Sequence, residues 1–132
     1  MLRRSFLALI AAVSFLPSLV VAQEFTDYTP GLIQTELDAG KTVFVDYSAV
    51  WCSTCARQER VIAELRRANA AYDDAMTFIK VDWDDYGRHA VSTSRNIPRR
   101  STLIVLRDDA ELGRIVAGTA AGDIQRLMDL GL

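Results

Sequence analysis

The sequence has few of the cysteine and histidine side chains that bind zinc, with two cysteines and one histidine among 132 residues. A structural zinc ion takes four Cys or His ligands, so this chain cannot complete such a site without carboxylates or a second chain. Basic residues are also not in excess, since 15 Lys and Arg stand against 17 Asp and Glu, which argues against a nucleic-acid partner. No repeat or low-complexity tract is present, and half of the residues are hydrophobic, which predicts one domain with a sizeable core.

The first 22 residues have the pattern of an export signal. The pair Arg3-Arg4 precedes an apolar stretch over 6–19, and V-V-A at residues 20–22 offers a cleavage site. This stretch is shorter than the ~20 residues of a membrane-spanning helix, so we expect cleavage after Ala22, with an uncleaved membrane anchor as the alternative. The opening R-R-S-F-L also resembles the twin-arginine export motif. We therefore predict a periplasmic domain over 23–132. The full chain has a formal net charge of −2, and the domain has −4 because the two arginines are removed.

The two cysteines lie at C-x-x-C spacing in the segment W-C-S-T-C, residues 51–55. Such a pair can close a small disulfide ring when the first cysteine stands at a helix N-terminus. There the free N–H groups and the helix dipole stabilise a thiolate on Cys52, while Cys55 lies one turn further into the helix. A static structural disulfide is the simpler alternative, but so short a ring constrains the unfolded chain much less than a long loop does. The spacing therefore favours reversible redox chemistry.

Hydrophobic periodicity predicts strands and helices that alternate along the chain. The predicted strands cover 23–28 at a sheet edge, 42–48, 76–82 and a hairpin of 101–106 with 112–117. The predicted helices cover 32–39, 52–74, 87–94 and 120–130, the second with Val61, Ile62, Leu65 and Ala68 inward, and an acidic turn at 82–85 precedes the third. This order is typical of an α/β protein with a mixed sheet and helices on both faces. Asp46 interrupts the apolar strand 42–48. Because burying a carboxylate is costly, we expect this residue to have a structural or functional role.

Residues 45–55, V-D-Y-S-A-V-W-C-S-T-C, resemble the active-site segment of the thioredoxin family, V-D-F-W-A-x-W-C-x-x-C. The acid has the family's spacing to both cysteines. Residues 78–82 resemble the family's central strand with its lysine, and Gly118 resembles the glycine that ends its last strand. The resemblance covers nearly all of residues 23–132 and implies a thioredoxin-like fold with a mixed central sheet and helices on both faces.

The resemblance also implies roles for four residues. Cys52 attacks a substrate disulfide and Cys55 resolves the mixed disulfide, while Asp46 lies buried beneath them with Lys80 nearby. Burial raises the pKa of a carboxyl group, so Asp46 is suited to take the proton from Cys55 as that thiol attacks. The alternative is that Asp46 only satisfies local hydrogen bonds or pairs with Lys80. Trp51, next to the first cysteine, is predicted to form a platform that faces the substrate.

The sequence departs from the family between the cysteines, where it has Ser53-Thr54. Reducing thioredoxins have Gly-Pro there, and oxidases and isomerases have Pro-His or Gly-His. Without a histidine beside it, Cys52 lacks one means of thiolate stabilisation, and a less stable thiolate makes a dithiol a better reductant. The dipeptide therefore favours a reductant or thiol-exchange protein over a strong oxidant.

A second departure concerns the cis-proline loop that faces the dithiol in this family. Ile97-Pro98 matches the motif by identity, but counting back from Gly118 places Ser101 and Thr102 where Pro-Thr should stand, and we favour Ser101. Because this loop pairs with the substrate in the family, the resemblance implies that Arg100, Ser101 and Thr102 bind substrate together with Trp51. A cis bond before a residue other than proline costs about 3 kcal/mol, so a trans Arg100–Ser101 bond is expected unless packing fixes it. The Ser101 hydroxyl could then donate to a thiolate, and Arg99 and Arg100 could add positive potential over Cys52, or simply lie in a solvated loop.

The sequence thus predicts an exported protein-disulfide oxidoreductase that works as a monomer without a dissociable cofactor or metal. Its partners would be protein disulfide substrates and a membrane electron donor, since a reductant in an oxidising compartment must itself be reduced again. One alternative is a binding module of the same fold that holds a soft metal such as Cu(I) through the two thiolates. Another is a disulfide oxidase or isomerase, which differs from the reductase only in redox potential.

Overall fold

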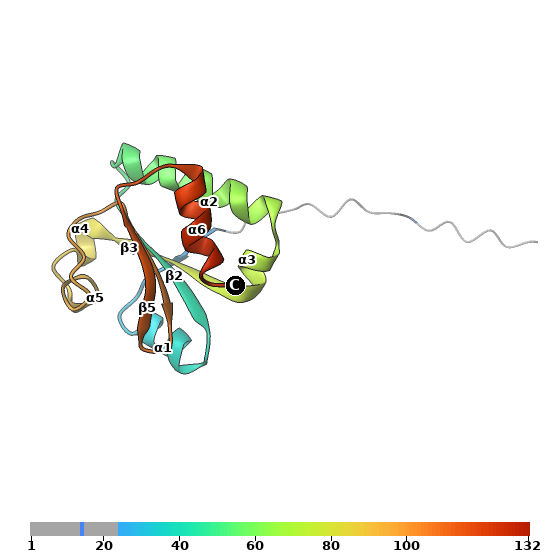
Figure 1. The fold of residues 1–132 in the computed structure, drawn as a ribbon. Helices are drawn as coiled ribbons and strands as arrows, with labels where there is room; N and C mark the ends of the chain where they lie inside the picture. Colours follow the sequence, from blue (N-terminus) through green and yellow to red (C-terminus); the bar gives the residue numbers. More distant parts are fainter. Residues whose placement is uncertain (1–13, 15–23) are drawn as a thin grey trace, which may run out of the picture.

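A computed structural model of the protein describes residue 14 and residues 24–132 (Figure 1). The predicted signal peptide, apart from residue 14, lies outside the described residues. The described chain forms one five-stranded sheet in the order β1-β3-β2-β4-β5. β1, β3 and β2 run parallel, β4 pairs antiparallel with β2, and β5 pairs antiparallel with β4. The strands are β1 (Thr26–Asp27), β2 (Thr42–Ser48), β3 (Met76–Asp82), β4 (Thr102–Arg107) and β5 (Ala110–Val116). The predicted mixed sheet is confirmed.

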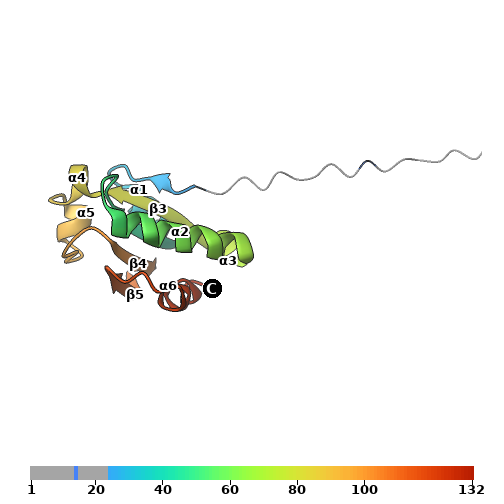
Figure 2. The same cartoon turned by 90° about the horizontal axis from the view of Figure 1, so that it is seen from above.

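Helices cover both faces of this sheet. They are α1 (Leu32–Asp38), α2 (Ser53–Ala68), α3 (Ala71–Ala75), α4 (Trp83–Tyr86), α5 (Ala90–Thr93) and α6 (Ala121–Asp129). Side chains of α1 and α5 pack with Val43 and Val45 in one apolar cluster, and side chains of α2, α3 and α6 pack with Phe44 and Phe78 in the other. Figures 1 and 2 show α2 and α6 on the same side of the sheet. No helix between residues 24 and 132 is both long enough and apolar enough to cross a bilayer.

The second predicted helix, 52–74, is wrong in its length and in part of its buried face. It breaks at Asn69, whose extended backbone separates α2 from α3. Ala68 is exposed, whereas Arg66 is buried and places its guanidinium 4.0 Å from the centre of the Phe78 ring. The same guanidinium bonds Asp73 at 2.6 Å, so a charged residue is accommodated inside because it is paired and stacked.

Two loops also differ from the prediction. The acidic segment 82–85 is not an open turn, because Asp82 caps α4 by accepting a hydrogen bond from the Asp84 N–H at 2.9 Å. The predicted helix 87–94 is shorter in the structure, where α5 covers only Ala90–Thr93. The hairpin between β4 and β5 is confirmed, but only Asp108 and Asp109 remain outside its strands, with Asp108 in the left-handed region at φ 53°.

The pleat of the two central strands decides which side chains meet α2. Alternate residues point to opposite faces, so Phe44, Asp46 and Ser48 of β2 share one face. On β3, Phe78 and Lys80 share it as well, because Phe44 is in register with Phe78 and Asp46 with Lys80. Phe44 and Phe78 pack with Ile62 of α2, so this is the face beneath that helix. A carboxylate and an ammonium group are thereby placed between the sheet and α2.

Candidate active site

Cys52 and Cys55 form a disulfide at the N-terminus of α2, with their Cα atoms 5.3 Å apart. Cys52 is the N-cap, and its Sγ accepts a hydrogen bond from the Cys55 N–H at 3.1 Å. Cys55 is fully buried, whereas Cys52 keeps 5 % of its surface exposed and lines a cleft of about 610 Å³. The outer sulfur is therefore the one that a partner can reach, and the Cys55 N–H at the start of α2 can stabilise it when it ionises.

Ser101 lies against both sulfurs. Its Oγ is 3.2 Å from Cys52 Sγ and 3.1 Å from Cys55 Sγ, and the side chain is fully buried. All peptide bonds described between residues 24 and 132 are trans, including Arg100–Ser101, and Ser101 reaches this position with a left-handed backbone at φ 62°. Such a φ is strained for a residue other than glycine. The position that faces the dithiol is therefore held by a hydroxyl-bearing residue.

The loop that carries Ser101 is fixed from several elements. The Ser101 N–H donates to the Tyr47 carbonyl at 2.7 Å, and its carbonyl accepts from the Ala117 N–H at 2.8 Å and from Gln58 Nε2 at 3.0 Å. Gln58, fully buried on α2, also donates to the Gly118 carbonyl at 2.9 Å. Because Gln58 and the cysteines are on one helix, these hydrogen bonds connect the loop directly to the helix that carries the dithiol.

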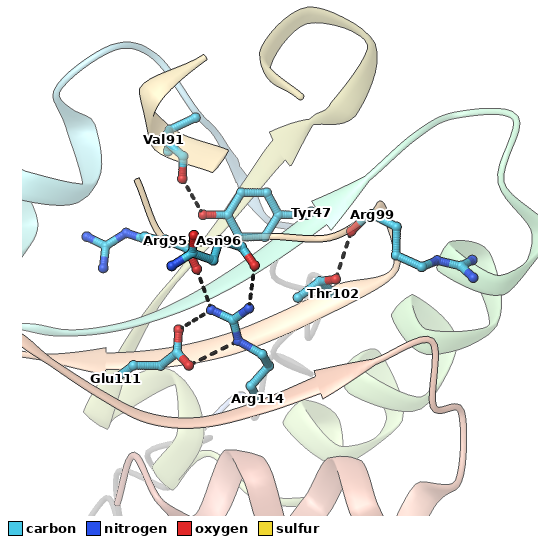
Figure 3. Close-up of polar contacts among 8 residues, drawn as sticks. All are labelled: Tyr47, Val91, Arg95, Asn96, Arg99, Thr102, Glu111 and Arg114. Carbon is cyan, nitrogen blue, oxygen red and sulfur yellow. Dashed lines mark hydrogen bonds and ion pairs between the residues drawn. The ribbon is translucent and has the colours of Figure 1, made fainter. Parts of the chain in front are cut away.

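A second set of contacts holds the part of the loop before Ser101 (Figure 3). Arg114 of β5 donates to the carbonyls of Arg95 at 2.7 Å and Asn96 at 2.9 Å, and it pairs with Glu111. The Thr102 hydroxyl donates to the Arg99 carbonyl at 2.7 Å. Thr102 is fully buried, so its side chain supports the loop and is not on the surface where a substrate would bind.

Trp51 stands beside the dithiol, with 58 % of its surface exposed. Its indole N–H donates to the Asp84 carboxylate, with the nearer oxygen at 2.9 Å. The Arg100 guanidinium lies over the ring, 4.3 Å from its centre, while its Nε is buried without a partner among the described residues. The indole is thus held between a carboxylate and a cation, and it presents apolar surface next to Cys52.

Asp46 is fully buried in β2, and neither of its carboxylate oxygens has a hydrogen-bond partner among the described residues. Burial raises the pKa of Asp46 well above its usual range, the nearby Glu59 carboxylate raises it further, and Lys80 opposes them. A neutral carboxylic acid is the favoured form here, because an unpaired buried charge is costly.

Lys80 is the register partner of Asp46, but its ammonium group bonds Glu59 of α2 at 3.0 Å. The same Glu59 oxygen, Oε1, accepts the Ser48 hydroxyl at 2.8 Å. Glu59, Lys80 and Ser48 line the cleft beside Cys52. The structure therefore brings the Glu59 carboxylate and the Lys80 ammonium group together with the dithiol at the N-terminal end of α2.

Two residues of this site, Gln58 and Glu59, were not predicted from the sequence. They lie three and four residues after Cys55, so helical spacing places them on the same face of α2 as that thiol. This spacing was available as a signal, but both polar side chains fit equally well on a solvent-facing surface.

The chain is similar to known thioredoxins over most of its length. A family model described as thioredoxin-like matches residues 26–111. Thioredoxin H5 of Oryza sativa subsp. japonica is 28% identical over 114 residues, which cover 76% of this chain and 80% of that protein. The thioredoxin of Mycolicibacterium smegmatis is 29% identical over 90 residues, covering 68% and 78% respectively. The crystal structure of Trxlp from Edwardsiella tarda EIB202 superposes with a TM-score of 0.67 at 27% identity, covering 79% of this chain and 98% of that one. With its C-x-x-C pair at the start of α2, this chain belongs to the thioredoxin-like family.

Proposed function

We propose that the protein is an exported, monomeric thiol–disulfide oxidoreductase of the bacterial cell envelope that reduces or exchanges disulfides in other proteins. The observation that carries this proposal is the dithiol itself: Cys52 caps α2 at the edge of a cleft, and Cys55 is buried behind it. Export rests on the N-terminal sequence pattern, and a reductant in that compartment needs an electron donor in the membrane.

The geometry supports a two-step exchange. The Cys52 thiolate attacks one sulfur of the substrate disulfide, which forms a mixed disulfide and releases the first substrate thiolate. Cys55 then gives up its proton and attacks Cys52 Sγ, which closes the Cys52–Cys55 disulfide and releases the second substrate thiolate. Two electrons pass from the dithiol to the substrate, and Asp46 is the candidate acceptor for the Cys55 proton.

Trp51 and the loop before β4 are suited to bind the substrate. Trp51 offers an exposed apolar ring with the Arg100 guanidinium stacked over it, and Ser101 lies against both sulfurs. The Ser101 hydroxyl can donate to a Cys52 thiolate, and the Arg100 guanidinium adds positive potential nearby. Both groups stabilise the Cys52 thiolate, as a histidine between the cysteines would, although the hydroxyl carries no charge.

Replacing Ser101 by glycine tests the role of the hydroxyl. Glycine tolerates φ 62°, so S101G removes the donor without adding backbone strain. A hydrogen bond to a charged group contributes about 1.5–3 kcal/mol, so the pKa of the Cys52 thiol should rise by roughly one to two pH units. The reduction potential should become more negative with it. Thiolate absorbance across a pH titration measures the first effect, and an unchanged titration in S101G rejects the role.

The reduction potential of the chain over 23–132 tests the direction of the reaction. Equilibration with glutathione and dithiothreitol, followed through the fluorescence of Trp51 and Trp83 beside the dithiol, should give a value near that of thioredoxin, about −270 mV, together with reduction of insulin disulfides. A value near that of periplasmic oxidants, about −120 mV, would reverse the proposed direction. A disulfide that reacts with neither couple would refute the redox function.

The predicted cleavage after Ala22 has its own test. Sequencing the exported product should find Gln23 at its N-terminus.

A further inference from the structure

Glu59 occupies an unusual place for a carboxylate. It projects from α2 toward the sheet, where Oε1 accepts the Ser48 hydroxyl at 2.8 Å and the Lys80 ammonium group at 3.0 Å. These donors come from β2 and β3, so the side chain is held by two different strands. Its side chain is 29 % exposed and lines the cleft that Cys52 also lines. Glu59 is thus both anchored and in contact with solvent.

Asp46 has the opposite character. It is fully buried, does not line the cleft, and lacks a hydrogen-bond partner among the described residues. Glu59 is the carboxylate beside it, and it also engages Lys80, the cation that is in register with Asp46. The negative charge of this pair of carboxyls therefore belongs on Glu59, and the proton belongs on Asp46.

This arrangement creates a difficulty for proton transfer from Cys55. A neutral Asp46 cannot accept a proton unless its own proton leaves, and burial separates it from bulk water. Glu59 is the group that lies next to Asp46 and also reaches the cleft. Cys55 precedes it by one helical turn on the same face of α2.

We propose that Glu59 is the second carrier of a two-carboxyl proton relay that runs from Cys55 through Asp46 to the cleft. When Cys55 attacks the mixed disulfide, its proton moves to Asp46 while the Asp46 proton moves to the Glu59 carboxylate, and from there to solvent. The S–S bond to the substrate breaks, the Cys52–Cys55 bond forms, and the substrate thiolate takes a proton from water. Lys80 and Ser48 both contact Oε1 of Glu59, and these two contacts hold the carboxylate in place as the acceptor. This inference rests on the proposed exchange reaction.

Other titratable groups face the same cleft and define the background of any pH profile. Asp27 and Tyr28 approach from the β1 side, and Asp82, Asp85 and Tyr86 from the end of β3 and α4. They remain unchanged in a Glu59 variant, so a difference from the wild type isolates the relay.

The test measures the resolving step directly. Ellman's reagent places a nitrothiobenzoate group on Cys52, and the release of the second nitrothiobenzoate dianion reports the attack by Cys55. The wild type, E59Q, D46N and the matched control E64Q, whose glutamate is exposed on α2, are compared from acidic to alkaline pH. We expect E59Q to be about tenfold slower near neutral pH, which is less than a full loss of acid–base catalysis, and to recover as pH rises and the buried Asp46 ionises. E64Q should follow the wild type, and D46N should be slow at every pH.

The direction of the change separates the relay from other roles. If Glu59 only repelled charge on Asp46, E59Q would be as fast as the wild type or faster near neutral pH, and that result overturns the relay. A loss that is equal at all pH values indicates a structural role and overturns it as well. Should E59Q fail to fold, E59D decides, because it keeps a carboxylate and must retain the wild-type shape of the profile. Insulin reduction by the wild type is measured separately, so failure of the proposed function and failure of the relay are distinct results.

Discussion

Cys55→Ser is expected to convert the protein into a trap for its substrates. Cys52 keeps its position at the start of α2, so the first attack and the mixed disulfide are still formed. The buried thiol that would release the substrate is gone, and a serine hydroxyl does not replace it as a nucleophile at neutral pH. Turnover of insulin disulfides should fall by a factor on the order of 10³ or more, because resolution is required in every cycle.

The small number of cysteines makes this experiment clean. The chain has only two, so every adduct on C55S must involve Cys52. Non-reducing gels and mass spectrometry of C55S isolated from cells should show covalent complexes that dithiothreitol reduces, and the trapped proteins identify the substrates. C52S is the control, since it leaves the buried thiol alone and should trap nothing. Equal trapping by both variants would contradict the assignment of Cys52 as the attacking residue.

The central part of the fold was predictable because its signals are local. The strand over 42–48 is short and β-branched, and the structure gives it the same bounds. Met76–Asp82 behaves likewise. The W-C-x-x-C spacing placed the dithiol at the start of a helix, where the Cys52 Sγ caps it. In each case the local pattern and the tertiary environment favour the same structure.

The parts that were not predictable depend on tertiary pairing of polar groups. Nothing in the sequence indicates that the charged residue Arg66 is buried, and it is buried because Asp73 and the Phe78 ring accommodate it. Gln58 is buried because it bonds two loop carbonyls that lie 43 and 60 residues away in the chain. Residue spacing also could not predict that Lys80 pairs with Glu59 and not with Asp46. This ion pair depends on how α2 packs against the sheet.

The position of Ser101 was predictable from the alignment with the family, but its backbone conformation was not. Counting residues favoured Ser101 over Pro98 for the position facing the dithiol, and Ser101 Oγ lies within 3.2 Å of both sulfurs. The left-handed backbone was not predictable, since serine has no preference for φ 62°. It follows from the bonds that its N–H and carbonyl make to Tyr47 and Ala117.

Asp46→Asn is expected to remove a pH-dependent loss of stability. The pKa of Asp46 is raised by burial in the folded protein, whereas in the unfolded chain it is near its ordinary value of about 3.9. Above that value the unfolded chain releases the proton and the folded chain retains it. The free energy of unfolding therefore falls as pH rises, by up to about 1.4 kcal/mol per pH unit, until the folded protein also ionises. Asparagine does not titrate, so D46N should lack this decline.

Urea unfolding of the oxidised protein at a series of pH values measures this difference. Other carboxylates titrate in both proteins, so the quantity to follow is the stability of D46N minus that of the wild type. It should grow steadily above about pH 4 and reach about 1 kcal/mol or more by pH 8. D74N, which alters an exposed acid on α3, should stay within about 0.5 kcal/mol of the wild type throughout.

The same substitution should slow the resolving step by about 100-fold, because the acceptor for the Cys55 proton is lost. Gain of stability with loss of activity is the combination expected of a buried acid that serves the reaction at a cost in stability. If the stability difference between D46N and the wild type does not vary with pH, Asp46 has the same protonation in the folded and unfolded chains. Burial would then not be setting its charge, and the neutral carboxyl on which the proton transfer depends would have no basis.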